Sequence, residues 1–592
     1  MSNTIPTKAS VNIASVKPNK FDLSCKHITT TDFGLLRPIY SRMMVPADRF
    51  EVAVNSFHRL DPMVAPNNSD MNVHTRAFFV PYRTFIPNFN EFIANTPGIS
   101  AGSLYASLKV PTFTGKVVLD AFQDTSLGTV VAYDKAGDLV FRDQIAKAWK
   151  KIKLTTRGRC FYSLLLSLGY NFRFDPVNAG DLEKQVYSAL PLLSYLKVWI
   201  DWYVPSRFYF TDTTIVALQK ILSPIQNSVN IVLSEFLSIS KALCVFFTED
   251  YFSNCLSNPF GDNMPSVRPV VNTTAFDSST VTSSVDNLKN GAVLQATDQD
   301  ALTQFNALSI KSLGAIQAML NRNAIVNQKL KDYIKINYGL EPNLDTFNMS
   351  HYLGSSLDQL IVGDVMSNAD TMQASGNVGA LLGQYAGKGL GSSDAKFTCH
   401  ATEFGMFLVL QDITPRPFYY QGVHVEHTAK SRYDFFDPTF DGIMTEAVPY
   451  SRLDNTCHND KLLTPQPDSI FGYMPVYSDY KVGYDILSGN FRMGSINTGL
   501  DSWYLARQFG DLFKTEHISL GFCDASILNS ANNFASLFYS DNSSADHIYQ
   551  VHNIRVTAYR RMRSLIEQVL DDDSDHNGSV TIDRMGTIAD RN

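Results

Sequence analysis

The chain has 592 residues, of which 44% are hydrophobic and 18% charged, and its formal net charge at pH 7 is −7. This composition supplies enough apolar surface for a folded core and excludes global disorder. The acidic balance also excludes a domain whose whole surface wraps nucleic acid, because such domains are usually strongly basic. The 39 Phe and 27 Tyr residues favour pleated strands and large interfaces.

The spacing of the cysteines and the length of the hydrophobic runs indicate the cellular compartment in which the protein folds. Seven cysteines lie far apart, with no Cys-x-x-Cys pair: Cys25, Cys160, Cys244, Cys255, Cys399, Cys457 and Cys523. This pattern favours reduced thiols made in a cytoplasm over a disulfide framework or a structural zinc site. No signal-peptide pattern opens the chain, and no stretch has the roughly twenty apolar residues of a membrane helix. We therefore expect a soluble, non-secreted protein without a membrane span.

The N-terminal part predicts an arm followed by strands. Residues 1–20 are polar and rich in Ser, Thr, Asn and Lys, which indicates a flexible arm, with ordered structure from about Phe21. Apolar and polar residues alternate from Phe50, and again from Met71 until Pro81. Both patterns predict strands with one buried face. Residues 21–95 are therefore expected to supply the first strands of a sheet.

Residues 96–395 change in character and predict helices and loops inserted between strands. Between Phe141 and Lys153, apolar residues recur at helical spacing among several lysines, which predicts a basic amphipathic helix. A buried helix is expected from Leu192 to Tyr203, with Pro191 well placed at its start.

Two further features are expected in this middle part. A longer helix is predicted from about Ser309 to Tyr338, and Gly339 can cap its end. Residues 261–300 are rich in Ser, Thr, Asn and Asp and have weak periodicity, which predicts an exposed, variable insertion.

Strand signals return after about Lys396. An apolar run extends from Phe404 to Leu410, and Ile554, Val556 and Ala558 alternate with polar residues. Residues 396–563 are therefore expected to hold the remaining strands, followed by an acidic extension over 564–592. If the two ends of the chain share one core, the fold is a β-sandwich or jelly roll with large insertions.

The catalytic motifs that were tested fail. The glycine-rich stretch from Gly379 to Gly391 has Leu382 where a phosphate loop needs glycine and Gly389 where it needs Ser or Thr, so we interpret it as a flexible surface loop. His424 and His427 are predicted to lie on a strand, where positions three apart face opposite sides, so they are interpreted as ordinary histidines. No nucleophile elbow or paired carboxylate stands out. We predict that the protein is not an enzyme.

The C-terminal segment partly matches a calcium loop. Asp573, Asp575 and Asn577 occupy the first, third and fifth positions of an EF-hand loop, and Gly578 occupies the sixth. The twelfth position is Arg584, so a cation replaces the bidentate Glu. A plain acidic turn is favoured, and calcium binding is the weaker alternative. No other cofactor is indicated.

The basic segment is the candidate nucleic-acid site. Six cations lie within thirteen residues that also contain Trp149: Lys147, Lys150, Lys151, Lys153, Arg157 and Arg159. Such a cluster can neutralise phosphates and stack on bases, whereas the alternative is a solvated helix face. A local contact of this kind would suit a net acidic protein.

Several segments resemble the characteristic blocks of major capsid proteins of microviruses, the small single-stranded DNA bacteriophages, and especially of the gokushovirus-like branch. In chain order they are VPADRF (45–50), LDPMVAP (60–66), FFVPYR (78–83), DYFSNCL (250–256), EPNLD (341–345), YLGS (352–355), TEFG (402–405), YQG (420–422), RYDFFDP (432–438), FGY (471–473), YKVGY (480–484) and DSWYL (501–505). Each block alone is weak, but their joint order over roughly residues 21–560 is specific.

The resemblance implies a mainly β protein with an eight-stranded antiparallel viral jelly roll, assembled as identical copies into an icosahedral shell around circular single-stranded DNA. It implies a virion protein assembled in the cytoplasm of a bacterial host. The partners implied are packaged DNA, a small basic DNA-binding protein, minor capsid or scaffolding proteins, and a host surface receptor reached by a loop within 261–300.

One departure and two alternatives remain open. Family members commonly end in an arginine and alternating prolines, whereas here YRRMR (559–563) precedes a longer acidic extension, so the role of 564–592 is open. A phage spike or receptor-binding protein is the alternative function, although fibrous repeats are missing. A carbohydrate-active enzyme on a β-sandwich is a third, disfavoured by the lack of an evident carboxylate pair.

Overall fold

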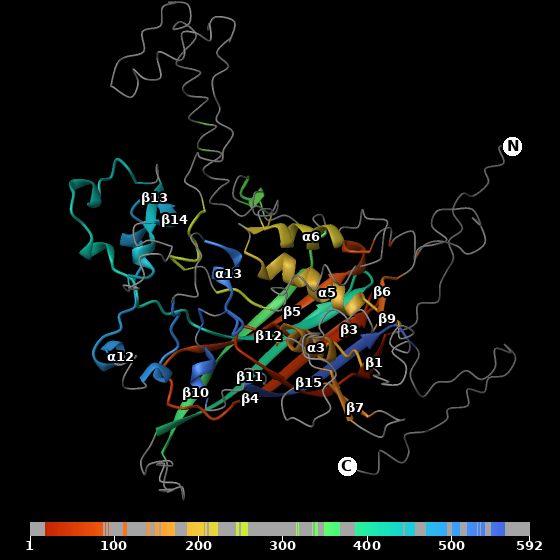
Figure 1. The fold of residues 1–592 in the computed structure, drawn as a ribbon. Helices are drawn as coiled ribbons and strands as arrows, with labels where there is room; N and C mark the ends of the chain where they lie inside the picture. Colours follow the sequence, from red (N-terminus) through yellow and green to blue (C-terminus); the bar gives the residue numbers. More distant parts are fainter. Residues whose placement is uncertain are drawn as a thin grey trace, which may run out of the picture.

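The chain is described by a computed structural model for residues 18–86, 110–114, 139–142, 149–152, 156–171, 186–222, 244–257, 338–340, 348–366, 385–455, 469–493, 500–509, 518–538 and 546–562, with short gaps inside some ranges and a few single positions between them. Within this part, nine strands form one antiparallel sheet in the order β1-β15-β4-β11-β10-β5-β12-β3, with β2 also paired to β15 (Figure 1). Their bounds are β1 Asn19–Asp22, β2 Cys25–Thr31, β3 Arg37–Met44, β4 Arg49–Leu60, β5 Met71–Pro81, β10 His351–Met366, β11 Tyr385–His400, β12 Gly405–Pro415 and β15 Ile548–Arg560.

Shorter elements surround this sheet. Three further antiparallel strand pairs are β6 (Thr112–Thr114) with β9 (Val186–Ser188), β7 (Leu139–Arg142) with β8 (Trp149–Ile152), and β13 (Thr445–Pro449) with β14 (Ile470–Pro475). The helices are α3 (Thr156–Ser167), α5 (Leu190–Val198), the π-helix η4 (Trp199–Tyr203), α6 (Thr213–Ile221), α12 (Asn490–Met493) and α13 (Leu520–Cys523). Short 3₁₀-helices are η1 (Tyr82–Thr84), η9 (Val425–His427), η10 (Arg432–Asp434), η11 (Tyr450–Arg452), η12 (Ser478–Lys481), η13 (Leu500–Trp503) and η14 (Phe534–Leu537).

The strands predicted near both ends of the chain are confirmed, and they pair with each other. Along β4 every second residue is buried, from Phe50 to Leu60, and β15 shows the same alternation. Val52 of β4 lies opposite Val556 of β15 in the register of the pair. Because side chains alternate between the two faces of a strand, this register places both apolar rows on the same side of the sheet.

The sheet curls into a half-barrel. The first part of β10 pairs with β5 and its last part pairs with β11, so β10 joins the two halves of the sheet. The opposite edges approach each other, since the guanidinium of Arg560 donates to the Met43 carbonyl at 2.8 Å and the ring of His27 lies 2.9 Å from the Ile39 carbonyl. The mainly β fold with inserted helices is confirmed. The curled sheet has nine strands instead of eight because β1 and β2 both pair with β15.

Apolar side chains fill one part of the half-barrel. They come from β3, β4, β5, β11, β12 and β15 and include Phe50, Phe79, Phe397, Phe407 and Val556. The Phe407 ring packs edge-on against Phe50, with 6.1 Å between the ring centroids. Strands from the two ends of the sequence therefore share one core, as the sequence analysis expected.

A buried polar layer continues the interior next to this apolar core. It consists of Ser56, His58, Thr75, Ser393, Gln411, Gln550 and His552, all buried. The Gln550 amide donates to Gln411 Oε1 at 3.1 Å, and the Gln411 amide donates to Thr75 Oγ1 at 2.9 Å. His58 Nε2 lies 3.1 Å from Ser393 Oγ, and His552 Nδ1 lies 2.7 Å from Ser56 Oγ. These hydrogen bonds join strands β4, β5, β11, β12 and β15 across the interior.

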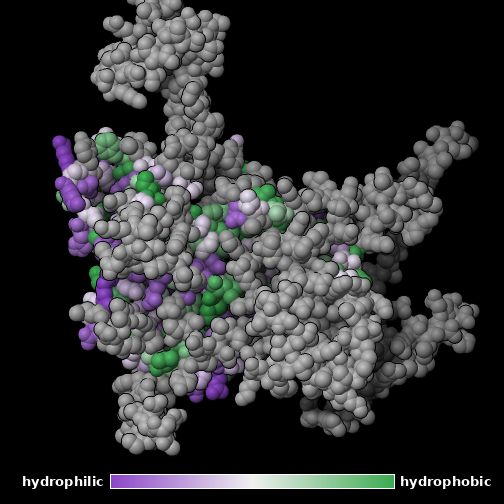
Figure 2. Space-filling model, in the orientation of Figure 1, coloured by the Kyte–Doolittle hydropathy of each residue, from purple (hydrophilic) through white to green (hydrophobic). Residues whose placement is uncertain are grey.

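The β13–β14 hairpin stands apart from the curled sheet, at the upper left of Figure 1. The loops around it carry green hydrophobic and purple hydrophilic residues side by side at the surface (Figure 2). Apolar side chains scattered over a surface are ordinary, whereas apolar side chains gathered in one patch can mark a contact site.

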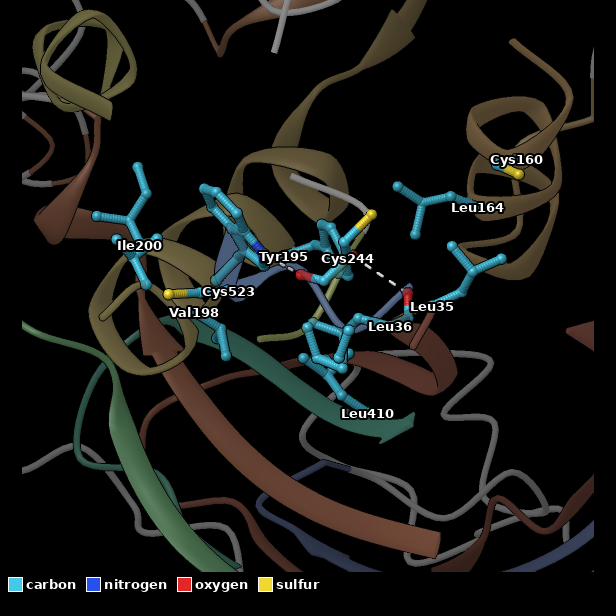
Figure 3. Packing of buried hydrophobic residues seen from close by; sticks show 14 of the residues in the cluster. Leu35, Leu36, Cys160, Leu164, Tyr195, Val198, Ile200, Cys244, Leu410 and Cys523 are labelled. Carbon is cyan, nitrogen blue, oxygen red and sulfur yellow. Dashed lines mark hydrogen bonds between the residues drawn. The ribbon is translucent and has the colours of Figure 1, made fainter. Parts of the chain in front are cut away.

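Helices cover the outer face of the strands β3, β5 and β12. Figure 3 shows Tyr195 and Val198 of α5 packed with Leu35, Leu36 and Leu410. The Tyr195 hydroxyl donates to the Leu36 carbonyl at 3.1 Å, and the Trp199 indole donates to the Cys244 carbonyl at 2.8 Å. The buried helix predicted from Leu192 to Tyr203 is confirmed as α5 continued by η4, with a proline in its first turn.

Two expectations for the middle of the chain are wrong. The strands do not return only after Lys396, because β10 and the first half of β11 already belong to the main sheet. The glycine-rich stretch interpreted as a flexible surface loop contains Gly387 and Gly389 of β11, and both are buried. A Cβ added at Gly387 would lie 2.5 Å from the Ala65 carbonyl oxygen, so these glycines allow close backbone packing.

Other expectations fall mostly outside the described residues. These are the arm up to residue 17, the insertion at 261–300, most of the helix predicted from Ser309 to Tyr338, and the extension from 563 onward. The predicted cap is confirmed, since Gly339 has a φ of 66° and its N–H donates to the Lys335 carbonyl at 2.9 Å. The first strand of the described part, β1, begins at Asn19, close to the start of ordered structure expected near Phe21.

Candidate assembly surface

The basic segment does not form the predicted amphipathic helix. Trp149 begins β8, and Lys150 and Lys151 lie opposite Phe141 and Val140 of β7 in an antiparallel pair. Arg157 and Arg159 lie in the separate helix α3, and Lys147 and Lys153 lie outside the described residues. Pairing with β7 overrides a local helical spacing, because hydrogen bonds between strands depend on contacts that a short window does not contain. DNA binding by these six residues stays a prediction.

The two histidines considered for a metal do not lie on a strand, because His427 ends the 3₁₀-helix η9 and His424 is its N-cap residue. The His427 N–H donates to the His424 carbonyl at 3.1 Å, and the ring centroids of the two side chains are 6.3 Å apart. The part of the chain that the structure describes contains no group of three or more His, Cys, Asp or Glu residues placed to hold a metal. Asp573, Asp575 and Asn577 lie outside it, so the calcium loop stays a prediction.

Two loop segments, residues 432–441 and 477–486, form a surface that we call the aromatic lobe. A capping box between Ser431 and Asp434 fixes the turn that opens the first segment. The Tyr480 hydroxyl donates to the Asp434 carbonyl at 3.4 Å, and Lys481 forms an ion pair with Asp441 at 3.0 Å. The two segments therefore lie side by side.

The aromatic lobe leaves many large apolar side chains in water. The exposed fractions are 62% for Phe435, 49% for Phe436, 40% for Phe440, 59% for Tyr480, 41% for Val482, 43% for Tyr484 and 71% for Ile486. Taking roughly 200 Å² for each full side chain, they expose about 700 Å². That area is at or above the largest patch of a typical monomer and close to the roughly 800 Å² that each partner buries in a standard interface. The lobe is suited to contact another protein.

A pocket of about 450 Å³ opens beside the lobe. At its edge Arg452 pairs with Asp479, donates to the Tyr251 hydroxyl at 3.1 Å, and lies 3.6 Å from Glu446. Burial raises the pKa of the Tyr251 phenol and of the Glu446 carboxyl. Two carboxylates and a phenol of the protein therefore contact the Arg452 guanidinium, and the described lining contains no Ser or Cys. The pocket is lined by side chains of the loops around the lobe.

The His424 ring connects the pocket to the lobe. It stacks on Tyr484, with 3.3 Å between the ring centroids and 21° between the ring planes. Burial, and then the neighbouring His427, lower the pKa of His424, so this ring is neutral at pH 7. A neutral ring suits the stacked contact with the phenol.

Arg507 joins several loops in the interior of the protein. It is buried, donates to the Phe522 carbonyl at 2.6 Å and to Asn532 Oδ1 at 3.1 Å, and reaches the Tyr419 hydroxyl at 3.2 Å. Its guanidinium also lies over four aromatic rings, with the Phe522 ring nearest at 4.3 Å. Hydrogen bonds and cation–π contacts together compensate for burying this charge.

A comparison with known protein families gives the identity. The family model described as "Capsid protein (F protein)" matches residues 9–137 and 186–565, which include every strand of the curled sheet. The chain belongs to the phage F capsid protein family. This capsid protein is 24% identical over 569 residues to capsid protein VP1 of Chlamydia phage 1, covering 85% of this chain and 89% of that protein. It is 23% identical over 503 residues to capsid protein VP1 of Bdellovibrio phage phiMH2K, covering 83% and 85%.

The family settles the function class. The protein is a structural component of a bacteriophage capsid, in agreement with the resemblance of its sequence blocks, and the family is one of structural proteins and not of enzymes. No helix in the described part of the capsid protein is long and apolar enough to cross a membrane. The matched family favours the shell over the spike.

The sequence analysis did not predict that the aromatic lobe is a surface suited to contact another protein. It used RYDFFDP (432–438) and YKVGY (480–484) as blocks of the resemblance and did not assign them a contact role. The available signal was Phe435 and Phe436 between Asp434 and Asp437 in a segment without strand alternation. Adjacent aromatic residues in such a polar loop have no core to enter, which favours an interface.

Proposed function

We propose that this capsid protein assembles as identical copies into a closed icosahedral shell around a circular single-stranded DNA genome, and that the aromatic lobe is a contact between neighbouring copies. The exposed apolar area of the lobe carries the second part of the proposal. A shell subunit must leave such surfaces in water until its neighbours cover them. Membership of a capsid family supports the first part.

The test compares a lobe variant with a matched control. Replacing Phe435, Phe436 and Ile486 together by Ser removes three large, exposed apolar side chains of the lobe without changing the curled sheet. The control is Val186→Ser on β9, which changes a side chain that is 59% exposed outside the lobe. Analytical ultracentrifugation and electron microscopy of the purified proteins report assembly, and circular dichroism reports folding.

Wild-type protein and the control are expected to form closed particles, and the lobe variant is expected to remain as folded, unassembled subunits. A folded lobe variant that forms particles as wild type does would refute the role of the lobe as a contact between neighbouring copies. Isolated wild-type trimers without closed particles would instead favour the spike reading.

The remaining partners are part of the same proposal. An exposed loop within 261–300 would contact a host surface receptor, and a small basic DNA-binding protein and minor capsid or scaffolding proteins would act during assembly in the bacterial cytoplasm. Limited proteolysis of free subunits and of particles tests the loop, because a surface loop remains open to cleavage in the particle.

A further inference from the structure

One outer face of the half-barrel is not covered by the helices of the described part. It consists of the outward positions of β1, β2, β4, β11 and β15. In β4, β11 and β15 these positions alternate with buried ones, and in β1 and β2 they alternate mostly with half-buried ones. The opposite half of the curled sheet packs against α5 and α3, whereas these outward side chains are exposed or half-buried. We call this surface the basic sheet face.

The charge of this face opposes that of the whole chain. Its outward cations are all exposed and are Lys20, Lys26, Arg49, Arg59, Lys388, Lys396 and Arg555. Its outward anions are Asp22, Glu51 and Asp394. Seven cations less three anions leave +4 on the described outward positions of five strands, in a chain with a net charge of −7. A positive surface of this kind attracts polyanions.

The strand register places two of these cations in one row. Arg555 and Lys396 both lie opposite Ala53, so two long cationic side chains flank a small one in one row across the sheet. Arg59 lies further along β4, on the same face as Ala53. The residues opposite Arg59 on the two neighbouring strands are Tyr549 and Leu390.

Most of these charges are available to a ligand. Arg49 is paired with Glu51 at 2.8 Å and lies over the Tyr559 ring. By contrast, Arg59, Lys396 and Arg555 form no ion pair with any residue of the described part.

Aromatic side chains stand among the cations. Phe57 is 49% exposed and Tyr549 is 47% exposed. Phe57 lies opposite Val551, and Tyr549 lies opposite Arg59, so both rings belong to the central strands β4 and β15. Exposed rings on a sheet that also carries cations form the platform on which unpaired bases stack while the phosphates are neutralised.

We propose that the basic sheet face binds single-stranded nucleic acid without base specificity, through Arg59, Lys396 and Arg555 to phosphates and through Phe57 and Tyr549 to bases. This inference rests on the proposed function, in which the packaged genome is single-stranded DNA, and it locates the DNA contact on the curled sheet and not on the segment at 147–159. Paired bases in a duplex cannot reach the rings, so the face prefers single strands.

The test measures binding of a fluorescent oligothymidine to the full-length subunit by anisotropy at several salt concentrations. The variant Arg59→Gln/Lys396→Gln/Arg555→Gln removes three unpaired cations. The matched control Arg416→Gln/Lys430→Gln/Arg432→Gln removes three exposed cations near the lobe. A third protein, Arg59→Lys/Lys396→Arg/Arg555→Lys, keeps the charges, and circular dichroism checks that each variant folds.

The sheet variant is expected to bind at least tenfold more weakly at low salt. Its log–log salt slope should fall by about two units, at about 0.7 for each phosphate that the variant no longer neutralises. The control and the charge-keeping protein should match wild type. Phe57→Ser should weaken binding about fivefold or more and leave the salt slope unchanged, because stacking releases no counterions.

Three results would overturn the inference: no binding by wild type at low salt, an equal weakening in the control, or equal affinity for polyglutamate, which would indicate a general polyanion surface. Electron microscopy of the same proteins separates the two proposals. Wild-type particles without subunit binding to oligothymidine would refute only the sheet face, whereas binding as expected without closed particles would refute only the shell.

Discussion

The polar layer inside the half-barrel should make the fold sensitive to acid. Burial lowers the pKa of His58 to about 4, and burial together with the neighbouring His58 and His27 lowers the pKa of His552 to about 3. Both lie below the ordinary value of 6.5, so both rings are neutral in the folded protein at pH 7. Their stabilising effect is complete above pH 6.5 and declines as the pH falls toward the folded pKa values, because the unfolded chain then binds more protons.

The size of the effect follows from the shifts. Lowering the pH from 6.5 to 5 costs about 1.4 kcal/mol per pH unit for each histidine, which gives about 2 kcal/mol each and about 4 kcal/mol together. A typical domain is stable by roughly 5–15 kcal/mol, so this decrease is large.

The variant His552→Asn removes the contribution of one of the two histidines to this loss of stability. Asn keeps a polar atom near Nδ1 to bond Ser56, and it cannot be protonated in this range. Denaturant unfolding of wild type and variant at pH 7, 6 and 5 should show a lower stability of the variant at pH 7, by about 1–2 kcal/mol for the missing ring. Its further decrease in stability on going to pH 5 should be about 2 kcal/mol smaller than in wild type. Equal decreases in the two proteins would refute the reasoning, since carboxylates contribute alike to both.

Three further predictions concern stability and reactivity. Arg507→Met should destabilise the subunit by about 2–4 kcal/mol in denaturant unfolding, because the Asn532 side-chain oxygen and the Phe522 carbonyl then lose a donor in a buried site, at about 1–3 kcal/mol for each unsatisfied acceptor. A destabilisation below about 1 kcal/mol would contradict this. Gly387→Ala should cost about 1–3 kcal/mol, because its Cβ would meet the Ala65 carbonyl, whereas Gly483→Ala, with open space around it, should change the unfolding midpoint little. A thiol reagent should modify the exposed Cys25 in the native subunit, more slowly than a free thiol because burial raises its pKa. The buried Cys160, Cys244, Cys255, Cys399 and Cys523 should react only on unfolding, as mass spectrometry can check; rapid native labelling of Cys244 would show that its cluster opens.

The sequence predicted the strands whose pattern is local. The alternation along β4, β5 and β15 identifies a buried and an exposed face without knowledge of any partner strand. The helix behind Pro191 was predicted for the same reason, since its residues are apolar all round and proline suits a first turn. The resemblance of ordered blocks predicted the capsid family.

The predictions from the sequence were wrong where the structure depends on contacts that a short window of sequence does not contain. The basic segment has helical spacing, yet it forms the β7–β8 pair, and the glycines of β11 look like a loop until Ala65 is seen against Gly387. Sequence spacing cannot report a backbone that approaches from a distant part of the chain. Such contacts decide whether a glycine marks a loop or a tightly packed strand.

What the sequence by itself determined is which faces are apolar and which family the chain resembles, because both depend on residue identity and order. Only the tertiary structure decided how those faces meet. It joins His58 and His552 into one buried layer, leaves Phe435 and Phe436 in water, and aligns Arg555 with Lys396 across Ala53. The buried histidine layer and the row of cations depend on strand register, which is set by the simultaneous burial of residues far apart in the chain. The exposure of Phe435 and Phe436 depends on which loop segments lie side by side.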